Sequence, residues 1–258
     1  MTEIIVLSLA ALITSLLTFF SGFGLGTILT PVFALFFPID LAIALTGVVH
    51  FLNNIFKLFL IGGKADKQVV IRFGVPAFIA ALLGAFLLLQ ISNLQAMHTY
   101  SLWNKEYSIT PVKLIIAVLL IGFALMEVIP HFKNIQFGKD KLILGGLLSG
   151  FFGGLSGNQG ALRSAFLIKS GLSKEAFVAS GIVIACIVDF SRLGVYMTRF
   201  SKSGLHDNLT LVLTATTAAF AGAYIGSHLL KKVTLETVQI IVTIMLIILS
   251  LALGLGIV

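Results

Sequence analysis

Apolar stretches of about 18 or more residues recur along the whole chain, and each is long enough to cross the roughly 30 Å hydrocarbon core of a bilayer. Only 10% of the 258 residues are charged and 58% are hydrophobic, whereas a soluble domain is about a quarter charged. A soluble domain would need a hydrophilic shell that this composition does not supply. We therefore expect an all-α polytopic membrane protein.

Hydropathy and helix breakers divide the chain into ten predicted membrane segments. They are approximately residues 4–21, 24–37, 40–62, 69–90, 111–130, 141–155, 158–170, 174–198, 207–230 and 234–257. The second and seventh segments are short, and each follows a glycine cluster, at residues 21–26 and 153–160. Pro31 and Pro38 limit the second segment further, because proline breaks the helical hydrogen-bond ladder.

The two glycine clusters occupy matching places, which indicates an internal repeat. A shift of 135 positions places Ser21-Gly22 on Ser156-Gly157, Asp40 on Glu175, and Asn54 to Leu58 on Asp189 to Leu193. The predicted units are residues 1–130 and 131–258, with five segments each. An odd number of crossings gives the two units opposite orientations, as in many secondary transporters.

The distribution of basic residues predicts the orientation in the membrane. If all ten segments cross, one side receives Lys64, Lys67, Arg72, Lys133, Lys139, Lys141, Lys169, Lys174, Lys231 and Lys232, and the other receives Lys105, Lys113, Arg199 and Lys202. If the second and seventh segments are re-entrant, the split is eight against six. The stronger bias favours ten crossings, with both termini on the extracytoplasmic side of the plasma (inner) membrane.

Four charged residues lie well inside predicted segments: Lys57, Arg163, Asp189 and Arg192. An ionised side chain at mid-membrane costs at least about 2.5–3.5 kcal/mol, so such residues indicate function. Three bases and one acid give a net charge of plus two, which suits an anion. The alternatives are that Asp189 and Arg192 only neutralise each other, that Arg163 pairs with Asp189 across helices, and that Lys57 snorkels toward lipid headgroups.

The glycine breaks offer a second kind of anion site, because an interrupted helix exposes N–H groups and a partial positive charge. The candidate residues are Gly22, Gly24 and Gly26 in the first half and Ser156, Gly157, Asn158, Gln159 and Gly160 in the second. The alternative is that the glycines only permit close helix packing. Asn54, Asn53 and His50 are further candidate donors, with a polar contact between helices as their alternative.

Over about residues 5–257 the chain resembles the TauE/SafE family, the sulfite-exporter-like or toluene-sulfonate-uptake permeases. The resemblance rests on the early glycine break, Pro31, Pro38 and the Asn53-Asn54 helix, followed by the break at 153–160 and the Asp189/Arg192 helix. It implies a plasma-membrane permease for small sulfur-containing or organic anions. Asn158-Gln159-Gly160 replaces a denser glycine run, and Arg163 stands where an apolar residue is typical, which makes Arg163 a candidate specificity residue.

The sequence thus predicts a secondary anion transporter that works by alternating access, with Asp189 as the candidate for proton coupling. An anion channel and a non-transporting membrane accessory protein are the alternatives. No motif for a metal, a nucleotide or a hydrolytic nucleophile is present, so we expect no enzyme activity and no cofactor. The expected partners are a small anion and the bilayer, with no nucleic acid; a homodimer is compatible with the sequence.

Overall fold

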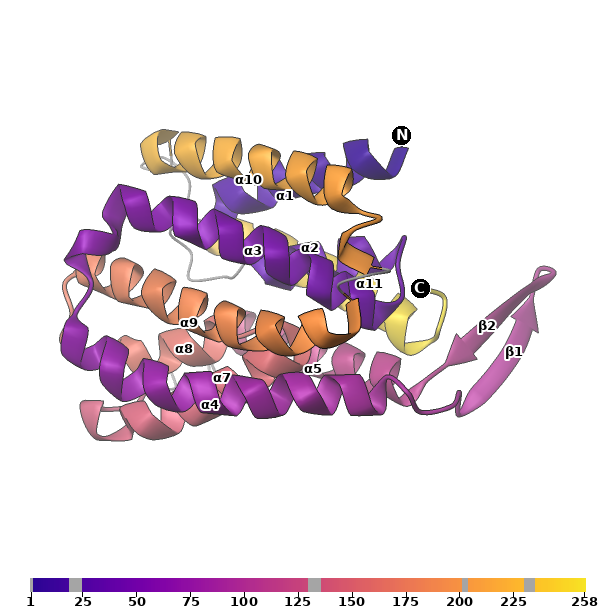
Figure 1. Cartoon of the computed structure of the whole chain (residues 1–258), viewed down its shortest axis with the longest axis horizontal. Coiled ribbons are helices and arrows are strands. Elements are labelled where there is room, and N and C mark those ends of the chain that lie inside the picture. The colour runs from indigo at the N-terminus through magenta and orange to yellow at the C-terminus, as the bar shows by residue number, and fades with distance from the viewer. Residues whose placement is uncertain (1, 19–24, 130–135, 201–203, 230–234) are drawn as a thin grey trace.

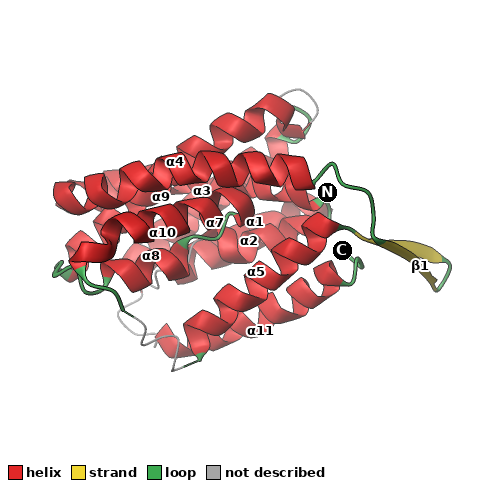
Figure 2. Ribbon diagram, turned by 90° about the horizontal axis from the view of Figure 1, so that it is seen from below, coloured by secondary structure: helices red, strands yellow, loops and turns green. Residues whose placement is uncertain are grey.

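The computed structural model describes residues 2–18, 25–129, 136–200, 204–229 and 235–258. Within these ranges ten α-helices run along one long axis (Figures 1 and 2). They are α1 (Thr2–Thr18), α2 (Leu25–Ala34), α3 (Ile39–Ile61), α4 (Lys67–Ile91), α5 (Pro111–Val128), α7 (Leu142–Ser156), α8 (Gly160–Leu167), α9 (Lys174–Phe200), α10 (Leu209–Leu229) and α11 (Leu235–Gly254). Two short 3-10 helices, η1 (Gly62–Lys64) and η2 (Lys139–Lys141), precede α4 and α7.

Four of the described helical stretches are long and apolar enough to cross a membrane. They are Ile39–Lys64, Lys67–Ile91, Lys174–Phe200 and Leu209–His228. The predicted all-α membrane architecture is therefore confirmed at the level of fold class.

Local chemistry explains where several helices begin. Asp66 caps α4, because its Oδ1 accepts a hydrogen bond from the backbone N of Val69 at 2.9 Å. α5 begins at Pro111, whose fixed φ suits the first position of a helix, and the Thr110 side chain accepts from the N–H of Lys113. α3 begins directly after Pro38, which the sequence analysis identified as a residue that limits the second segment.

Glycines let two pairs of helices pack backbone against backbone. α4 packs along α7, where a Cβ at Gly150 or Gly154 would collide with the carbonyl oxygens of Ala77 and Ala81 respectively. Small residues of this kind replace the hydrophobic driving force that lipid cannot supply between helices. Gly150 and Gly154 thus serve close helix packing on the α4 side of α7.

The same arrangement joins α1 to α10. A Cβ at Gly222 of α10 would collide with the carbonyl oxygen of Leu12 in α1. Between these outer pairs, α3 and α9 lie side by side and α5 packs against α11 (Figures 1 and 2). The polar residues discussed below lie on α3, α9 and the ends of the short helices next to them.

The second and seventh segments are shorter than the sequence predicted. α2 has 10 residues and α8 has 8, which at the helical rise amounts to about 15 and 12 Å. α8 runs back along α7: the Cβ position of Gly145 meets the ring of Phe166, and the N of Phe137 donates to the carbonyl of Ala165 at 3.2 Å. The outer ends of α7 and α8 therefore lie together, and the two helices form a helical hairpin within the bundle.

A β-hairpin projects from one end of the bundle (Figures 1 and 2), in a polar interval for which the sequence predicted no structure. It consists of β1 (His98–Leu102) and β2 (Lys105–Ile109). The turn residues Trp103 and Asn104 both have positive φ, as a two-residue hairpin turn requires. Tyr100 donates to the carbonyl of Leu255 at 2.7 Å, which ties the hairpin to the end of the chain.

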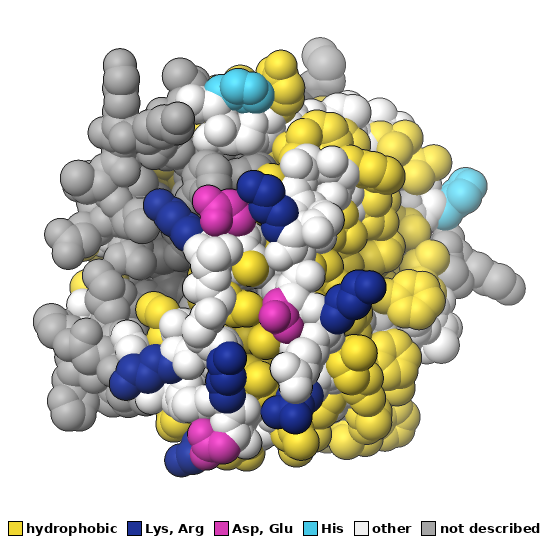
Figure 3. All heavy atoms as spheres, turned by 90° about the vertical axis from the view of Figure 1, so that its left-hand side faces the viewer, with side chains coloured by type: hydrophobic (Ala, Val, Ile, Leu, Met, Phe, Trp, Pro, Cys, Tyr) yellow, Lys and Arg dark blue, Asp and Glu magenta, His cyan; other side chains and the backbone are white. Residues whose placement is uncertain are grey.

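Basic side chains gather at the opposite end of the bundle (Figure 3). The described members of the larger predicted group are all exposed there, around η1, η2 and the connection before α9: Lys64, Lys67, Arg72, Lys139, Lys141, Lys169 and Lys174. Lys105, Lys113 and Arg199 lie toward the hairpin end. The described lysines and arginines of these two groups thus lie at opposite ends of the bundle, as the prediction of ten crossings grouped them.

Candidate functional site

The break between α7 and α8 meets the beginning of α2. Gly157 ends α7 in the left-handed conformation, with φ of 77°, and its N donates to the carbonyl of Gly153 at 3.0 Å. The Cβ position of Gly26 in α2 lies 3.1 Å from the carbonyl oxygen of Gly157. Next to this contact, Thr27 Oγ1 donates to Asn158 Oδ1 at 3.0 Å. Residues 131 positions apart are therefore brought together inside the bundle.

Asp189 of α9 is the centre of a buried polar cluster. Its Oδ1 lies 2.9 Å from Arg192 Nε and 2.8 Å from Arg192 Nη2. Its Oδ2 lies 2.6 Å from His50 Nδ1 and 3.4 Å from Asn54 Nδ2, both on α3. All four side chains are buried. The predicted Asp189–Arg192 pair is present, and α3 adds two more partners to the same carboxylate.

Two glycines make room for the Arg192 guanidinium between α3 and the break. The Cβ position of Gly47 in α3 lies 3.3 Å from Arg192 Cζ, and that of Gly157 lies 2.9 Å from Arg192 Nη1. A side chain at either position would displace the guanidinium or the backbone. Arg192 is therefore held by Asp189 on one side and faces the helix break on the other.

Lys57 and Arg163 extend the basic region along α3 and α8. Lys57 is 5% exposed and Arg163 is 9% exposed, and the two cations repel each other electrostatically. Arg163 Nε lies 3.4 Å from the Cβ position of Gly181, which places its guanidinium against α9. Lys57 is thus enclosed by the bundle, which argues against the alternative that it snorkels to headgroups.

Several buried donors around the break have no hydrogen-bond partner among the residues that the structure describes. These atoms are Arg163 Nη1, Arg192 Nη1, Asn158 Nδ2, Gln159 Nε2 and the hydroxyls of Thr30 and Thr46. Leaving a buried donor unpaired costs about 1–3 kcal/mol, and more when it is charged. A set of such donors around cationic groups is suited to the oxygens of an anion.

The other predicted break residues have local roles. Ser156 Oγ donates to the carbonyl of Phe152 at 2.9 Å and accepts from the N of Asn158 at 3.3 Å, which shapes the turn. The carbonyl of Gln159 accepts from the N of Arg163 at 3.0 Å. Gly160 is the first residue of α8. Gly22 and Gly24 lie outside the described residues.

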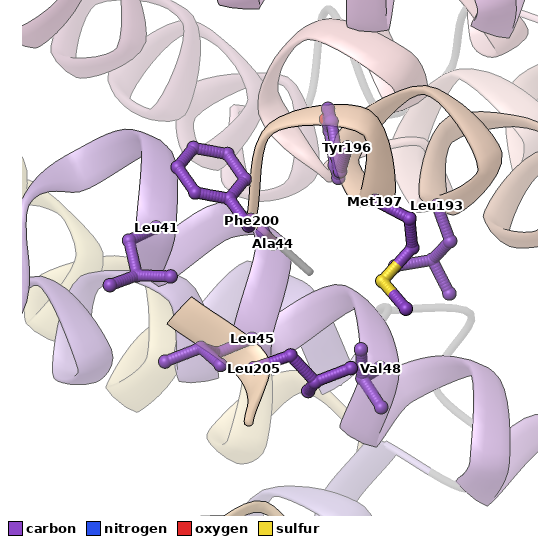
Figure 4. A pocket seen from close by; sticks show the side chains of 9 residues that line it. All are labelled: Leu41, Ala44, Leu45, Val48, Leu193, Tyr196, Met197, Phe200 and Leu205. Carbon is purple, nitrogen blue, oxygen red and sulfur yellow. The ribbon is translucent and has the colours of Figure 1, made fainter. Parts of the chain in front are cut away.

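An apolar hollow borders this cluster between α3 and α9 (Figure 4). Its lining consists of Leu41, Ala44, Leu45, Val48, Leu193, Tyr196, Met197, Phe200 and Leu205. Tyr196 supplies the hydroxyl of this lining, and that hydroxyl donates to the carbonyl of Gly154. The hollow therefore offers an anion no free charge, and the charged cluster beside it is the candidate binding site.

No group of three or more His, Cys, Asp or Glu side chains that could hold a metal ion occurs in the described part of the chain.

A family model described as sulfite exporter TauE/SafE matches residues 7–253. The chain belongs to the TauE/SafE family. No curated protein and no solved structure shows significant similarity to it. TauE/SafE proteins are membrane permeases for sulfur anions rather than enzymes, and this one is an integral membrane protein.

The site of this TauE/SafE protein includes residues that the sequence analysis did not single out. Thr27, Thr30 and Gly47 surround Arg192 and the break, and they look like ordinary helix residues in the sequence. Thr27 and Thr30 lie three residues apart directly after a glycine break, and this spacing was the signal in the sequence that could have identified them as site residues. His50 was considered only as a donor beside Asn54, whereas the structure makes it the closest partner of Asp189.

Proposed function

We propose that this protein is a secondary transporter that moves a small sulfur-containing or organic anion across the plasma membrane by alternating access. The observation that carries this proposal is the set of buried, unpaired donors around the α7–α8 break, within the described residues. Lys57, Arg163, Arg192 and Asp189 give this region a net charge of plus two when His50 is neutral. An anion that enters the region replaces water with fixed donors and neutralises surplus positive charge.

Each part of the cluster has a distinct task in binding. Arg163, Arg192 and Lys57 attract the anion, while the amides of Asn158 and Gln159 bind its oxygens, together with Asn54 and the N–H groups exposed at the break. Asp189 competes with the anion for Arg192, so its protonation would free that guanidinium for the substrate. Asp189 is on this ground the acidic candidate for proton coupling.

Helix packing supports the division into two inverted units, residues 1–130 and 131–258. Exchanging each helix with its equivalent in the other unit turns the α4–α7 pair into α10–α1, and the α4–α9 pair into α10–α3; all four pairs are in contact. The α3–α9 and α5–α11 pairs are their own equivalents and are also in contact. This exchange is what a two-fold axis in the membrane plane requires.

An ion pair at one end of the α3–α9 pair and an electrostatic interaction at the other end support alternating access. Asp40 Oδ2 at the start of α3 lies 3.5 Å from Arg199 Nη2 near the end of α9. Glu175 at the start of α9 interacts electrostatically with Lys64 beyond the end of α3. The two pairs are equivalent under the 135-residue shift. They mark the two mouths of the proposed path, which would open one at a time.

The proposed orientation follows from the same geometry. If α7 and α8 enter and leave the membrane on the same side as one hairpin, the segments that follow keep the direction that ten crossings would give them. The ten-against-four split of basic residues then holds, unlike the case in which the second and seventh segments alone are re-entrant. The cation-rich end in Figure 3 would be cytoplasmic. Both termini and the β-hairpin would then be extracytoplasmic.

Anion flux into proteoliposomes tests the function directly. Purified protein is reconstituted and assayed with sulfite, thiosulfate, methanesulfonate and sulfate, and Arg163→Ala, Arg192→Ala and Asp189→Asn are compared with Arg72→Ala, a control at an exposed position of α4. We expect at least about tenfold slower flux for the three site variants and unchanged flux for the control. Wild-type rates in all three site variants would contradict the site, and conductance without uphill accumulation would favour a channel.

A further inference from the structure

Building on the proposed function, we propose that His50 takes up the coupled proton in place of the Asp189 carboxylate considered above, and that Asp189 remains ionised as the fixed counter-ion of His50. The inference concerns the same anion site but assigns the proton to a residue on the other central helix. It follows from the hydrogen bonds that Asp189, His50 and Asn54 make with one another.

Asp189 already has a donor on each carboxylate oxygen. Arg192 occupies Oδ1 with two nitrogens, at 2.8 and 2.9 Å, and His50 Nδ1 occupies Oδ2 at 2.6 Å. A proton placed on this carboxylate would have to displace one of these donors. The second nitrogen of the His50 ring, Nε2, is not taken up by the bond to Asp189, so the ring is the better place for an added proton.

Asn54 lies against both partners of the proposed proton site. Its Nδ2 lies 3.2 Å from His50 Nδ1, 3.3 Å from His50 Nε2 and 3.4 Å from Asp189 Oδ2. The amide is thus nearly equidistant from the two ring nitrogens, while Nδ1–H donates to Asp189 and the added proton would go to Nε2. Proton uptake therefore places a positive charge against this amide donor, beside the proposed anion path.

The charged groups around His50 come from the two central helices. Burial opposes the protonated ring, Asp189 favours it through its charge and its hydrogen bond, and the charges of Arg192 and Lys57 oppose it. α2, which packs on α3, carries no titratable side chain. Where the structure describes their side chains, titratable residues on the other elements in contact with α3 lie toward the ends of those elements: Lys64, Lys113, Tyr224 and His228.

Charge balance couples the proton to the anion. With a neutral ring, Asp189, Arg192 and His50 together are neutral, and Arg192 is committed to Asp189. With a protonated ring, two cations share one carboxylate and the trio carries a charge of plus one. A bound anion restores neutrality, and by linkage each ligand then strengthens the binding of the other. The expected result is symport of a proton with the anion.

The test measures protons and anions in the same proteoliposomes, with a pH-sensitive dye inside. Methanesulfonate is the main probe, because it stays ionised across the pH range used, and sulfite is the second probe. In His50→Gln we expect the number of protons moved per anion transported to fall at least about tenfold, and this ratio is compared so that a change in the anion flux itself does not decide the outcome. His206→Gln makes the same substitution at an exposed residue and should keep the wild-type ratio.

A second measurement uses the wild-type protein, so it does not depend on the folding of a variant. NMR of the histidine ring nitrogens follows each ring as pH changes, and saturating methanesulfonate or sulfite should move the His50 midpoint upward by about one pH unit for tenfold coupling. A wild-type proton-to-anion ratio in His50→Gln, anion flux without proton movement in the wild type, or an unmoved midpoint would each overturn the inference. Absence of any anion flux in the wild type would instead overturn the proposed function.

Discussion

Replacing Gly157 with alanine should weaken anion binding by displacing Arg192. The residue has a φ of 77°, a conformation that costs a residue with a Cβ about 1–2 kcal/mol. The new methyl carbon would lie 2.9 Å from Arg192 Nη1. An ordinary contact begins near 3.4 Å, so the guanidinium would have to move by about half an ångström away from the break.

The guanidinium is not free to make this movement. Arg192 is held by Asp189 at 2.8 and 2.9 Å, and Gly47 of α3 packs against its Cζ. A hydrogen bond to a charged group contributes about 1.5–3 kcal/mol, so a partial loss corresponds to roughly tenfold weaker binding, or about 1.4 kcal/mol. The backbone strain adds about 1–2 kcal/mol to the loss of folding stability.

Gly171→Ala is the matched control. Gly171 has a φ of 70°, but its Cβ position meets the flexible end of Lys139 at 3.4 Å and no site residue among the atoms near it. Both variants should lose about 1–2 kcal/mol of unfolding free energy in detergent to backbone strain, whereas only Gly157→Ala should bind sulfite more weakly in an equilibrium titration. Equal sulfite affinity in the two variants would refute the reasoning about Arg192.

Two further predictions concern packing and orientation. Gly150→Val should separate α4 from α7, since its Cβ would collide with the carbonyl of Ala77; we expect a loss of about 1–3 kcal/mol in the free energy of unfolding, with Gly122→Ala, which has open space, nearly neutral. Lys64→Cys and Lys105→Cys, in a background lacking the native cysteine, should react with an impermeant maleimide from opposite sides of the membrane, and labelling from the same side would contradict the orientation.

The sequence predicted the helices well because their limits depend on local chemistry. Pro111 starts α5 at the predicted residue, and Pro38 precedes α3. The short second and seventh segments were recognised from their glycines, but their lengths were overestimated. Hydropathy continues beyond the residues that form α8, whereas the helix itself ends at Leu167, next to the start of α7.

The β-hairpin was missed because its signal is weak in a polar interval. Tyr100 pairs with Tyr107 across the two strands, and Trp103-Asn104 forms the turn. Over strands of only five residues the alternation of apolar and polar side chains is a weak signal, and Trp103-Asn104 is not one of the usual glycine-containing hairpin turns. The pairing becomes evident only when both strands are placed together.

The charged site was predictable in part because buried charge is rare and costly in membranes. That argument found Lys57, Arg163, Asp189 and Arg192 without any knowledge of their contacts. It could not find the bond between His50 and Asp189, which are separated by 139 positions and meet only because α3 packs on α9. A histidine in an apolar helix has many possible partners, and tertiary packing selects among them.

The glycine contacts along α4 and α7 have a mechanical consequence. Where a carbonyl oxygen occupies the notch left by a missing side chain, as at Gly150 and Gly154, one helix cannot slide past the other without lifting out of register. The α1–α10 contact at Gly222 has the same character. We therefore expect the two helices of each outer pair to move together as one rigid body. The proposed alternating access would then require movement mainly at the central α3–α9 contact, where the ion pair and the hydrogen bonds can exchange partners.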